Sequence, residues 1–465
     1  MNDARSYARE HAPRFRQQYE TLLRIPTVST LPQYSGDVER AAQWLARDMR
    51  AIGMDSAEVL HLPGGRHPLV LGEWHGAGES APTVLLYAHY DVQPAAMEDG
   101  WDSDPFEPVE RDGRLYCRGS VDSKLHVMSQ LKALESLLAS PGGGPVNIKL
   151  LLEGEEESGS ESISAFMAQQ PQRVRSDVAV ISDGVVLAPQ QPSLVYALRG
   201  IVTMELHVEG PAQDLHSGHF GGTLHNPLQA LAEIVAQLHD ADGRVSVPGF
   251  YDDVVEADAA ERAQLAHSNA WSERDWEAVA AAPLHYGEPG FNTQERIGLR
   301  PTLEINGLNG GYSGPGFKTV LPQRAMAKIS CRLVPQQDPQ RIFDLLQQHV
   351  AAITPPTVRG ELRQLEMGSP AALLGRDTRA MRAAAAAYEH AWGVAPLFER
   401  AGGSIPVTYA LQEVCEELVI MGFGYRDGRA HGPNENVHVD SLERGVNAAI
   451  HFLQGIGATY NSLQV

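Results

Sequence analysis

The amino-acid sequence predicts an α/β protein, in which a mostly parallel sheet is flanked by helices and a two-layer α+β domain is inserted. Three observations predict this fold. Apolar runs and helical repeats alternate in the first half of the chain, a half-exposed alternating pattern replaces them near Gly200, and the first pattern returns after about residue 371. Strand–helix–strand order implies right-handed crossovers between parallel strands. We therefore expect a larger domain in segments 1–199 and 371–465, and an inserted domain at 200–370.

Helices and strands alternate in the first segment. Apolar residues recur at helical spacing in 35–53 and 125–140, and the first of these stretches ends at a glycine. Three short apolar runs, at 82–90, 146–154 and 176–184, have the length and composition of buried strands.

The inserted segment has a different pattern. Residues 195–210 alternate like a strand with one exposed face, and 225–243 has an asparagine cap, a proline in its first turn and a final glycine, which together indicate a helix. The further expected elements are strands at 300–311 and 319–335, a helix at 338–353 and a weak strand at 361–367. This order is typical of a two-layer domain with an antiparallel sheet. We interpret 244–299, rich in Ala, Asp, Glu and Trp, as an insertion within it.

The last segment returns to the first pattern. It contains a helical stretch at 377–393, a core strand at 416–424 and a closing helix at 441–457. These elements complete the larger domain.

Composition excludes several classes of protein. The chain has 465 residues, 43% of them hydrophobic, and a formal net charge of -21, which disfavours binding to nucleic acid or an anionic membrane. The cysteines, at 117, 331 and 415, are scattered, so neither a disulfide framework nor a thiolate zinc site is indicated. No apolar leader or run of about 18 apolar residues occurs, so we expect a soluble cytoplasmic protein.

Acidic and histidine residues follow the predicted strands. His89 and Asp91 end one strand, the acidic run 155–157 ends the next, Asp183 ends a third, and His431 follows the last. Each feature alone is more often a loop pair, a solvated charge run, a turn or a helix cap. Their joint placement indicates a site, because ligands of open parallel sheets bind outside the carboxyl ends of the strands.

A fifth residue completes a candidate metal centre. Asp122 lies in the loop 114–127, just before a predicted helix, and a carboxylate can bridge two cations about 3.5–4 Å apart. Mixed nitrogen and oxygen ligands suit zinc, manganese or cobalt, and zinc is the default for a hydrolase. The predicted ligands of two divalent metal ions are His89, Asp122, Glu157, Asp183 and His431.

Seven motifs together resemble one family. They are LYAHYDVQP, CRGSVDSK, LEGEEESGS, ISDG, DLHSGHFGG, GGSIPVT and HGPNEN, and they span the chain from about residue 20 to the C-terminus. The chain resembles the co-catalytic zinc metallopeptidases, a family that includes carnosinase, cytosolic non-specific dipeptidase, aminoacylase and succinyl-diaminopimelate desuccinylase. The similarity is greatest to the dipeptidase branch, through LEGEEESGS, DLHSGHFGG and KTVLP…SCRLVP.

The resemblance implies a zinc-exopeptidase-like catalytic domain and roles for the strand-end residues. His89, Asp122 and Asp183 would hold one metal ion, and Asp122, Glu157 and His431 the other. Asp91 would orient His89, and Glu156 would be the general base toward a water activated by both metals. Ser158 and Gly159 set this register; a slip by one residue would give the roles to Glu155 and Glu156. The peptide bond after Asp122 would be cis.

The inserted domain would act as a lid and a dimerisation domain. His216 would stabilise the oxyanion from the partner subunit, so a homodimer is implied, whereas His219 has no assigned role. Arg332 would bind the carboxylate of the substrate, because a guanidinium matches its geometry, and Thr319 and Ser404 resemble further substrate contacts.

Three functions stay open at this point. The first is a metal-dependent dipeptidase, the second an N-acyl amino-acid deacylase such as a desuccinylase or aminoacylase, and the third a non-catalytic peptide-binding relative. The third is disfavoured because all five ligand positions and Glu156 are intact. The first two differ in the shape of the substrate pocket.

Overall fold

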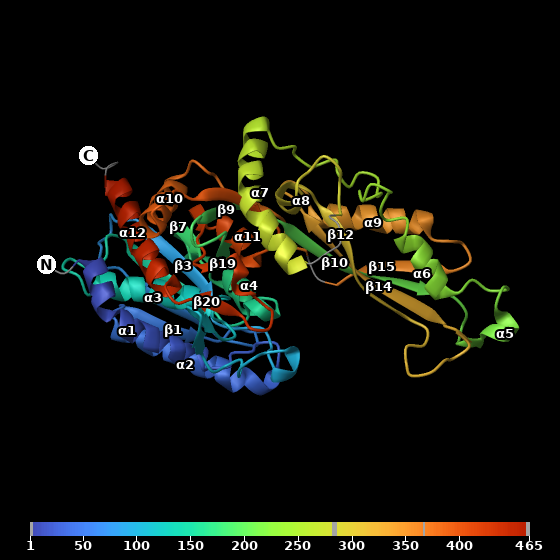
Figure 1. The fold of residues 1–465 in the computed structure, drawn as a ribbon, viewed down its shortest axis with the longest axis horizontal. Coiled ribbons are helices and arrows are strands. Elements are labelled where there is room, and N and C mark those ends of the chain that lie inside the picture. Colours follow the sequence, from blue (N-terminus) through green and yellow to red (C-terminus); the bar gives the residue numbers. More distant parts are fainter. Residues whose placement is uncertain (1–2, 281–285, 366–367, 462–465) are drawn as a thin grey trace. The chain divides into compact units, whose positions relative to one another are not determined.

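The protein divides into two compact units in the computed structural model, which describes residues 3–280, 286–365 and 368–461 (Figure 1). The first unit comprises Met1–Tyr196, Leu374–Glu399 and Ile405–Val465, and the second comprises Ala197–Leu373 and Arg400–Ser404. The crossings predicted from the sequence lie at residues 199 and 370, and the return of 400–404 to the second unit was not predicted. The assignment of the second unit as a lid and dimerisation domain stays a prediction.

A mixed sheet forms the centre of the first unit. Its strands follow the order β1 (Ser56–Leu60), β2 (Leu69–Trp74), β6 (Asn147–Glu153), β3 (Thr83–His89), β7 (Ser176–Ile181), β18 (Cys415–Ile420), β9 (Ser193–Leu198) and β16 (Ala372–Leu373), and β17 (Leu397–Ala401) also pairs with β9. The four strands from β6 to β18 are parallel, whereas the outer pairs are antiparallel.

The parallel centre aligns the carboxyl ends of its strands. His89 at the end of β3 is in register with Glu153 at the end of β6, and Tyr87 is in register with Ile181 of β7. These strands are buried along nearly their whole length, which explains why they read as continuous apolar runs. The polar residues that follow them therefore gather at one edge of the sheet.

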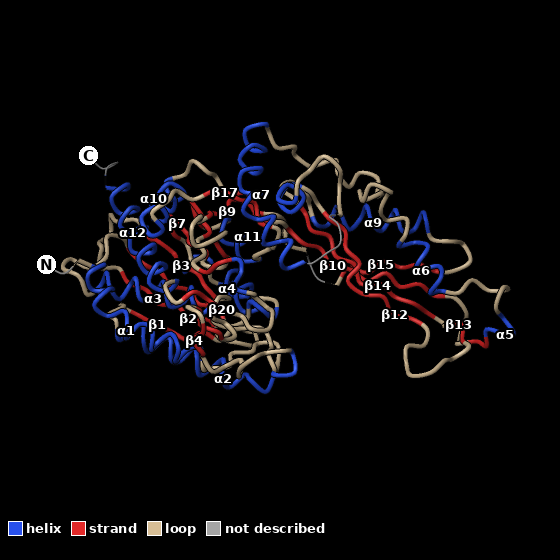
Figure 2. Tube along the Cα trace, in the orientation of Figure 1, coloured by secondary structure: helices blue, strands red, loops and turns tan. Residues whose placement is uncertain are grey.

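Helices cover this sheet (Figure 2, blue). The helix α3 (Lys124–Leu138) packs against α1 (Ala4–Leu23) and α12 (Ser441–Asn461), and α12 also packs against α10 (Arg379–Trp392). The remaining helices are α2 (Ser35–Ala51), α4 (Glu161–Gln169) and α11 (Pro406–Gln412). Residue 124 begins α3 directly after the loop that carries Asp122, so the packing of this buried helix fixes that loop.

Two small sheets hold the loops beside these strand ends. One has the order β20 (Asn436–His438), β5 (Arg114–Tyr116) and β4 (Val109–Arg111), and it brings the segment after His431 next to the segment before Asp122. The other pairs β8 (Val185–Val186) with β19 (Gly424–Tyr425), directly after Asp183.

The second unit is a two-layer α+β domain. Its antiparallel sheet has the order β12 (Thr302–Gly310), β14 (Arg324–Leu333), β10 (Gly200–Glu209) and β15 (Arg359–Gln364), and α6 (Pro227–Val235) and α9 (Pro339–Ile353) pack against it. The predicted order of elements is observed. Two predicted strands differ from the prediction, because each forms two strands that belong to different sheets. The segment 195–210 forms β9 and β10, and 319–335 forms β13 (Val320–Leu321) and β14.

The segment 244–299 contributes two helices, α7 (Ala259–Ala280) and α8 (Thr293–Leu299), to the second unit. A two-stranded sheet of β11 (Leu215–His216) and β13 (Val320–Leu321), with α5 (Ser217–Phe220), lies at one end of this unit (Figure 2). Among the described residues, every helix is too short or too polar to cross a membrane.

Candidate metal centre

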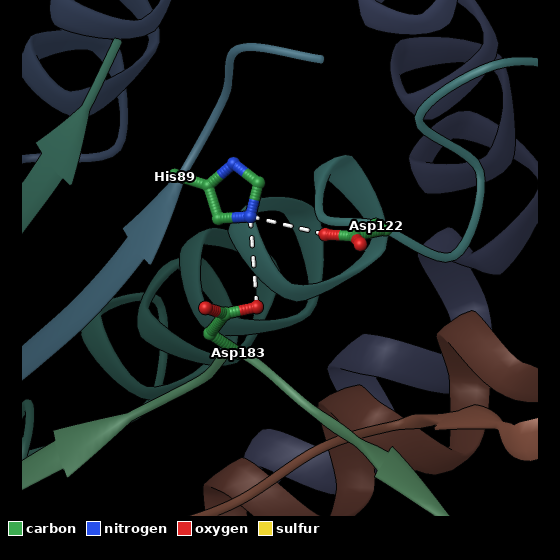
Figure 3. Close-up of side chains that lie close together, drawn as sticks. All are labelled: His89, Asp122 and Asp183. Atoms are coloured by element: carbon green, nitrogen blue, oxygen red, sulfur yellow. Dashed lines mark hydrogen bonds and ion pairs between the residues drawn. The ribbon is translucent and has the colours of Figure 1, made fainter. Parts of the chain in front are cut away.

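Three side chains from separate segments meet at the carboxyl ends of the parallel strands (Figure 3). The Nε2 atom of His89 lies 3.1 Å from Oδ1 of Asp122 and 3.5 Å from Oδ1 of Asp183. The candidate ligand atoms of this triad all lie within 4.8 Å of one another. His89 ends β3, Asp183 follows β7, and Asp122 precedes α3, so the sheet and one helix position all three.

A second triad shares Asp122 with the first. The Nε2 atom of His431 lies 3.1 Å from Oδ2 of Asp122 and 3.2 Å from Oε1 of Glu157, and these ligand atoms also lie within 4.8 Å of one another. Asp122 thus directs Oδ1 to one imidazole and Oδ2 to the other. The His431 side chain is 56% exposed while that of His89 is 1% exposed, so the second triad is the one that opens to solvent.

The charges of these residues fit divalent cations. Hydrogen bonds to Asp122 and Glu157 raise the pKa of His431 to about 10. Burial lowers the pKa of His89, but hydrogen bonds to Asp122 and Asp183 outweigh it and raise this pKa well above its usual value. The three carboxylates therefore draw positive charge onto both imidazoles. A divalent transition metal binds such nitrogen and oxygen donors and displaces the protons.

Asp122 itself is held ionised. Burial raises the pKa of its carboxyl group, but the hydrogen bonds from His431 and His89 outweigh this effect and hold the pKa well below its usual range. The peptide bond between Asp122 and Ser123 is cis, as the family resemblance implied.

Asp91 connects the first triad to the acidic run. Its Oδ1 accepts a hydrogen bond from the backbone N–H of Glu156 at 3.1 Å, and its Oδ2 accepts one from the N–H of Glu157 at 3.0 Å. The hydroxyl of Ser29 donates to Oδ2 at 2.6 Å. The His89 Nδ1 atom lies 3.4 Å from Oδ1 of Asp91 and hydrogen bonds to the backbone carbonyl of Asp91 at 3.1 Å. Asp91 therefore holds the segment 156–157 more directly than it holds His89.

The three glutamates of the acidic run have different surroundings. Glu155 is buried and accepts hydrogen bonds from the backbone N–H groups of Arg66 and Ser162, away from the triads. Glu157 belongs to the second triad, whereas Glu155 does not; the assignment of Glu157 as a metal ligand and Glu156 as the base stays a prediction. Within the part of the chain that the structure describes, no hydrogen bond reaches the carboxylate of Glu156. Burial and the neighbouring Asp183 raise the pKa of Glu156 to about 9.

Sequence reasoning missed two polar residues beside the triads. Gln93 donates a hydrogen bond from Nε2 to Oε2 of Glu157 at 2.8 Å, which leaves Oε1 for His431. The imidazole of His126 contacts the Ser123 hydroxyl through Nδ1 at 3.1 Å and accepts from the Phe423 N–H through Nε2. The position of Gln93 two residues after Asp91 in the motif LYAHYDVQP could have indicated its role. His126 gives no such signal, because it lies within a predicted apolar helix.

Two substrate-binding candidates of the second unit are in contact. Arg332 donates from Nη1 to Oγ of Ser404 at 2.9 Å, and the Ser404 hydroxyl donates to the carbonyl of Arg199. Arg199 was not predicted; burial first, and then the nearby Arg332, lower its pKa to about 10. Within the described residues, neither arginine forms an ion pair with a carboxylate. The result is a small cationic site beside the loop 400–404.

The other two candidates lie elsewhere in the same unit. His216 pairs with Val320 across β11 and β13, and the carbonyl of Thr319 accepts from the N–H of Ser217 at 3.1 Å. His216 and Thr319 are exposed, and the His216 ring stacks on that of His219 at 4.7 Å. These residues adjoin the end of β14 at Arg324, whereas Arg332 lies near its other end.

A sheet whose strand ends unite two histidine–carboxylate triads around one shared aspartate defines a dinuclear metallohydrolase. A family model described as peptidase family M20/M25/M40 matches residues 85–455, and the chain belongs to this family. It is therefore a metal-dependent peptide hydrolase.

Named relatives are similar along most of the chain. The Cys-Gly metallodipeptidase of Schizosaccharomyces pombe is 32% identical over 446 residues, which cover 92% of this chain and 93% of the relative. The human Beta-Ala-His dipeptidase is 31% identical over 437 residues, covering 92% and 82%. The crystal structure of an M20 family metallo-carboxypeptidase from Sulfolobus solfataricus superimposes with a TM-score of 0.83, at 28% identity, and covers 96% of this chain and 99% of that chain.

The contacts of Asp91 generate a first prediction. Asp91→Asn places an amide group against one of the two backbone N–H donors, so it should loosen the segment 156–157, weaken zinc binding about 10–100-fold and lower kcat. Isothermal titration of the metal-free protein with Zn²⁺ and steady-state kinetics would measure both effects.

A matched control is Asp177→Asn. Asp177 also accepts a backbone N–H, from Thr83 at 2.7 Å, but at the opposite end of the same strands. This variant should lose stability and retain zinc affinity. Equal zinc affinity in Asp91→Asn and the wild type would contradict the role given to Asp91.

Proposed function

We propose that this protein is a dipeptidase that uses two zinc ions to hydrolyse the peptide bond of dipeptides. The observation that carries the proposal is the Asp122 carboxylate shared between two triads, with the unbonded carboxylate of Glu156 beside them. We assign His89, Asp122 and Asp183 to one ion, and Asp122, Glu157 and His431 to the other. The names of the metallodipeptidase and Beta-Ala-His dipeptidase relatives support dipeptides as the substrates.

Glu156 would move the protons in this reaction. When bound, two divalent cations supply Lewis acidity that brings the pKa of water toward about 7 and polarises a carbonyl group. Glu156 accepts a proton from the attacking water on its free carboxylate and then donates it to the nitrogen of the leaving amine. The contact of Asp91 with its N–H group holds the backbone of Glu156 in place.

The arginine site of the second unit would bind the free carboxylate of the dipeptide. Arg332 lacks an acidic partner among the described residues, and Ser404 orients its guanidinium. A guanidinium binds a carboxylate with two parallel hydrogen bonds. Such a clamp restricts substrates to those that end in a carboxylate close to the scissile bond. N-acyl amino acids meet the same requirement, so the deacylase stays the alternative to be tested.

A homodimer would complete the site with His216 and Thr319. Arg324 and Arg332 are eight residues apart on β14, a separation of about 26 Å at ~3.3 Å per residue. His216 adjoins the Arg324 end, so the His216 and Arg332 of one subunit would not reach the same dipeptide. In a two-fold dimer, His216 of each subunit would instead reach the active site of the partner subunit. The cytoplasmic location expected from the sequence stays a prediction.

The activity itself gives a prediction. The purified protein should cleave dipeptides and lose this activity on treatment with a chelator, and Zn²⁺ should restore it. Glu156→Gln should lower kcat about 10²–10⁴-fold because the base is lost, while two zinc ions still bind. A panel of dipeptides, N-acetyl amino acids and N-succinyl amino acids would measure it; preference for N-acyl substrates, or full turnover without metal, would contradict the proposal.

The carboxylate clamp gives a separate prediction. Arg332→Met should raise KM for a dipeptide about 10–100-fold, because a charge-assisted pair is lost, and should barely affect a dipeptide amide. Lys328→Met, on the same strand but with an exposed side chain paired to Glu205, is the control and should leave KM unchanged. An equal loss on the dipeptide and its amide would show that Arg332 does not bind the carboxylate.

The shared site predicts complementation between subunits. His216→Ala and Glu156→Gln should each be nearly inactive alone. Co-expression of the two should yield mixed dimers in which one of the two sites is complete, so that a purified mixed dimer has about one half of the wild-type activity. Activity assays on the tagged and purified mixed dimer would measure this, and a mixture as inactive as its parents would contradict the exchange of His216.

A further inference from the structure

A buried ion pair outside both triads joins the loops that carry them. Arg118 Nη1 donates to Oε2 of Glu435 at 2.7 Å, and the two side chains are 3% and 0% exposed. Replacing such a pair by apolar residues is often neutral for stability, so a buried pair is weak evidence for a stabilising role. The other contacts of these two residues indicate a different role.

The other hydrogen bonds of the Glu435 carboxylate all go to the loop that carries Asp122. Its Oε2 accepts from the N–H of Gly119 at 3.1 Å, and its Oε1 accepts from the N–H groups of Val121 at 2.8 Å and Asp122 at 3.1 Å. The carbonyl of Glu435 accepts from the N–H of Cys117 at 3.0 Å. The single carboxylate of Glu435 thus holds three backbone N–H groups of this loop, including that of Asp122 itself.

Arg118 reaches the other two loops. Its Nη2 donates to the backbone carbonyls of Pro94 at 3.3 Å and His431 at 3.2 Å. Pro94 directly follows Gln93, the residue that hydrogen bonds to Glu157. The guanidinium also lies 5.3 Å from the centre of the Trp101 ring. The pair therefore ties the segments that bear Asp122, His431 and Gln93 to one another.

The loop that carries His431 needs such support. His431 and Asn434 have φ angles of 63° and 57°, a left-handed conformation that residues other than glycine adopt rarely and at a cost of about 1–3 kcal/mol. Arg118 holds the carbonyl of His431, and the Asn434 side chain accepts from the N–H of Asp102 at 3.0 Å. These contacts keep the imidazole of His431 directed at Oδ2 of Asp122.

We propose that Arg118 and Glu435 are positioning residues of the metal centre, which fix the separation between Asp122 and His431 before any cation binds. This inference rests on the proposed metal ligands. Because Glu435 holds Asp122 and Arg118 holds His431, the pair acts mainly on the second triad, which is the more exposed one. The first triad shares only Asp122 with it and depends less on the pair.

Zinc binding to the metal-free protein tests the proposal without measuring activity. In Glu435→Gln the new amide opposes an N–H donor, so one of two zinc ions should bind about 10–100-fold more weakly, and the other should change less. A titration with Zn²⁺ in competition with a chromophoric chelator measures both steps. At saturating zinc, KM for a dipeptide should stay close to that of the wild type.

The control is Glu135→Gln in the same unit. Glu135 is also buried and pairs with a buried lysine, Lys132, and with Arg14, but it lies on α3 away from the triads. This variant should lower the thermal midpoint and leave both zinc steps unchanged.

Two outcomes would overturn the proposal. Zinc affinities of Glu435→Gln that equal those of the wild type would do so, and so would an equal loss of affinity in Glu135→Gln. If Glu435→Gln does not fold, Arg118→Lys carries the same test, because one ammonium group cannot span Glu435, Pro94 and His431. The proposed function is tested separately, by the binding of two zinc ions to the wild-type protein. The behaviour of the variants tests only the positioning role of Arg118 and Glu435.

Discussion

The contact on which this structure depends is that of one carboxylate with two imidazoles. Asp122 presents Oδ1 to His89 and Oδ2 to His431. Among the residues that the structure describes, the carboxylates of the two triads are paired with these two histidines and with no lysine or arginine. Without cations, this concentration of negative charge is balanced by protons on the imidazoles, as the raised pKa values of both histidines indicate. The aligned ends of β3, β6 and β7, and the buried helix α3, hold the groups in place against that repulsion.

The support around this contact is built from hydrogen bonds between carboxylates and the backbone. Asp91 holds the N–H groups of Glu156 and Glu157, Glu155 holds those of Arg66 and Ser162, and Glu435 holds the loop of Asp122. Acidic residues are thus used both as candidate ligands and as clamps, and only their surroundings distinguish the two uses. These buried carboxylates contribute to the net charge of -21.

The elements that sequence predicted best are those whose pattern is local. The buried parallel strands read as apolar runs, and the residues directly after them, His89, Asp91, Glu157 and Asp183, were found because an edge of a parallel sheet gathers strand ends. Contacts between distant segments could not be predicted. Nothing local in CRGSVDSK reveals that Arg118 pairs with Glu435, 317 residues later, or that Arg199 meets Ser404. The strands β1 and β2 and the helix α1 were also not recognised, since short strands and a helix that contains Pro13 give weak periodic signals.

The chain passes between its two units at four places, and the last excursion into the second unit is only five residues long, Arg400–Ser404. Those few residues include the hydroxyl that contacts Arg332 and the carbonyl that accepts from Nε of Arg199. The second unit is therefore no self-contained module. A gene fragment that encodes 197–373 alone would lack Ser404. If recombination exchanged this fragment between relatives, the transferred Arg332 would therefore meet the 400–404 segment of the recipient protein instead of its own.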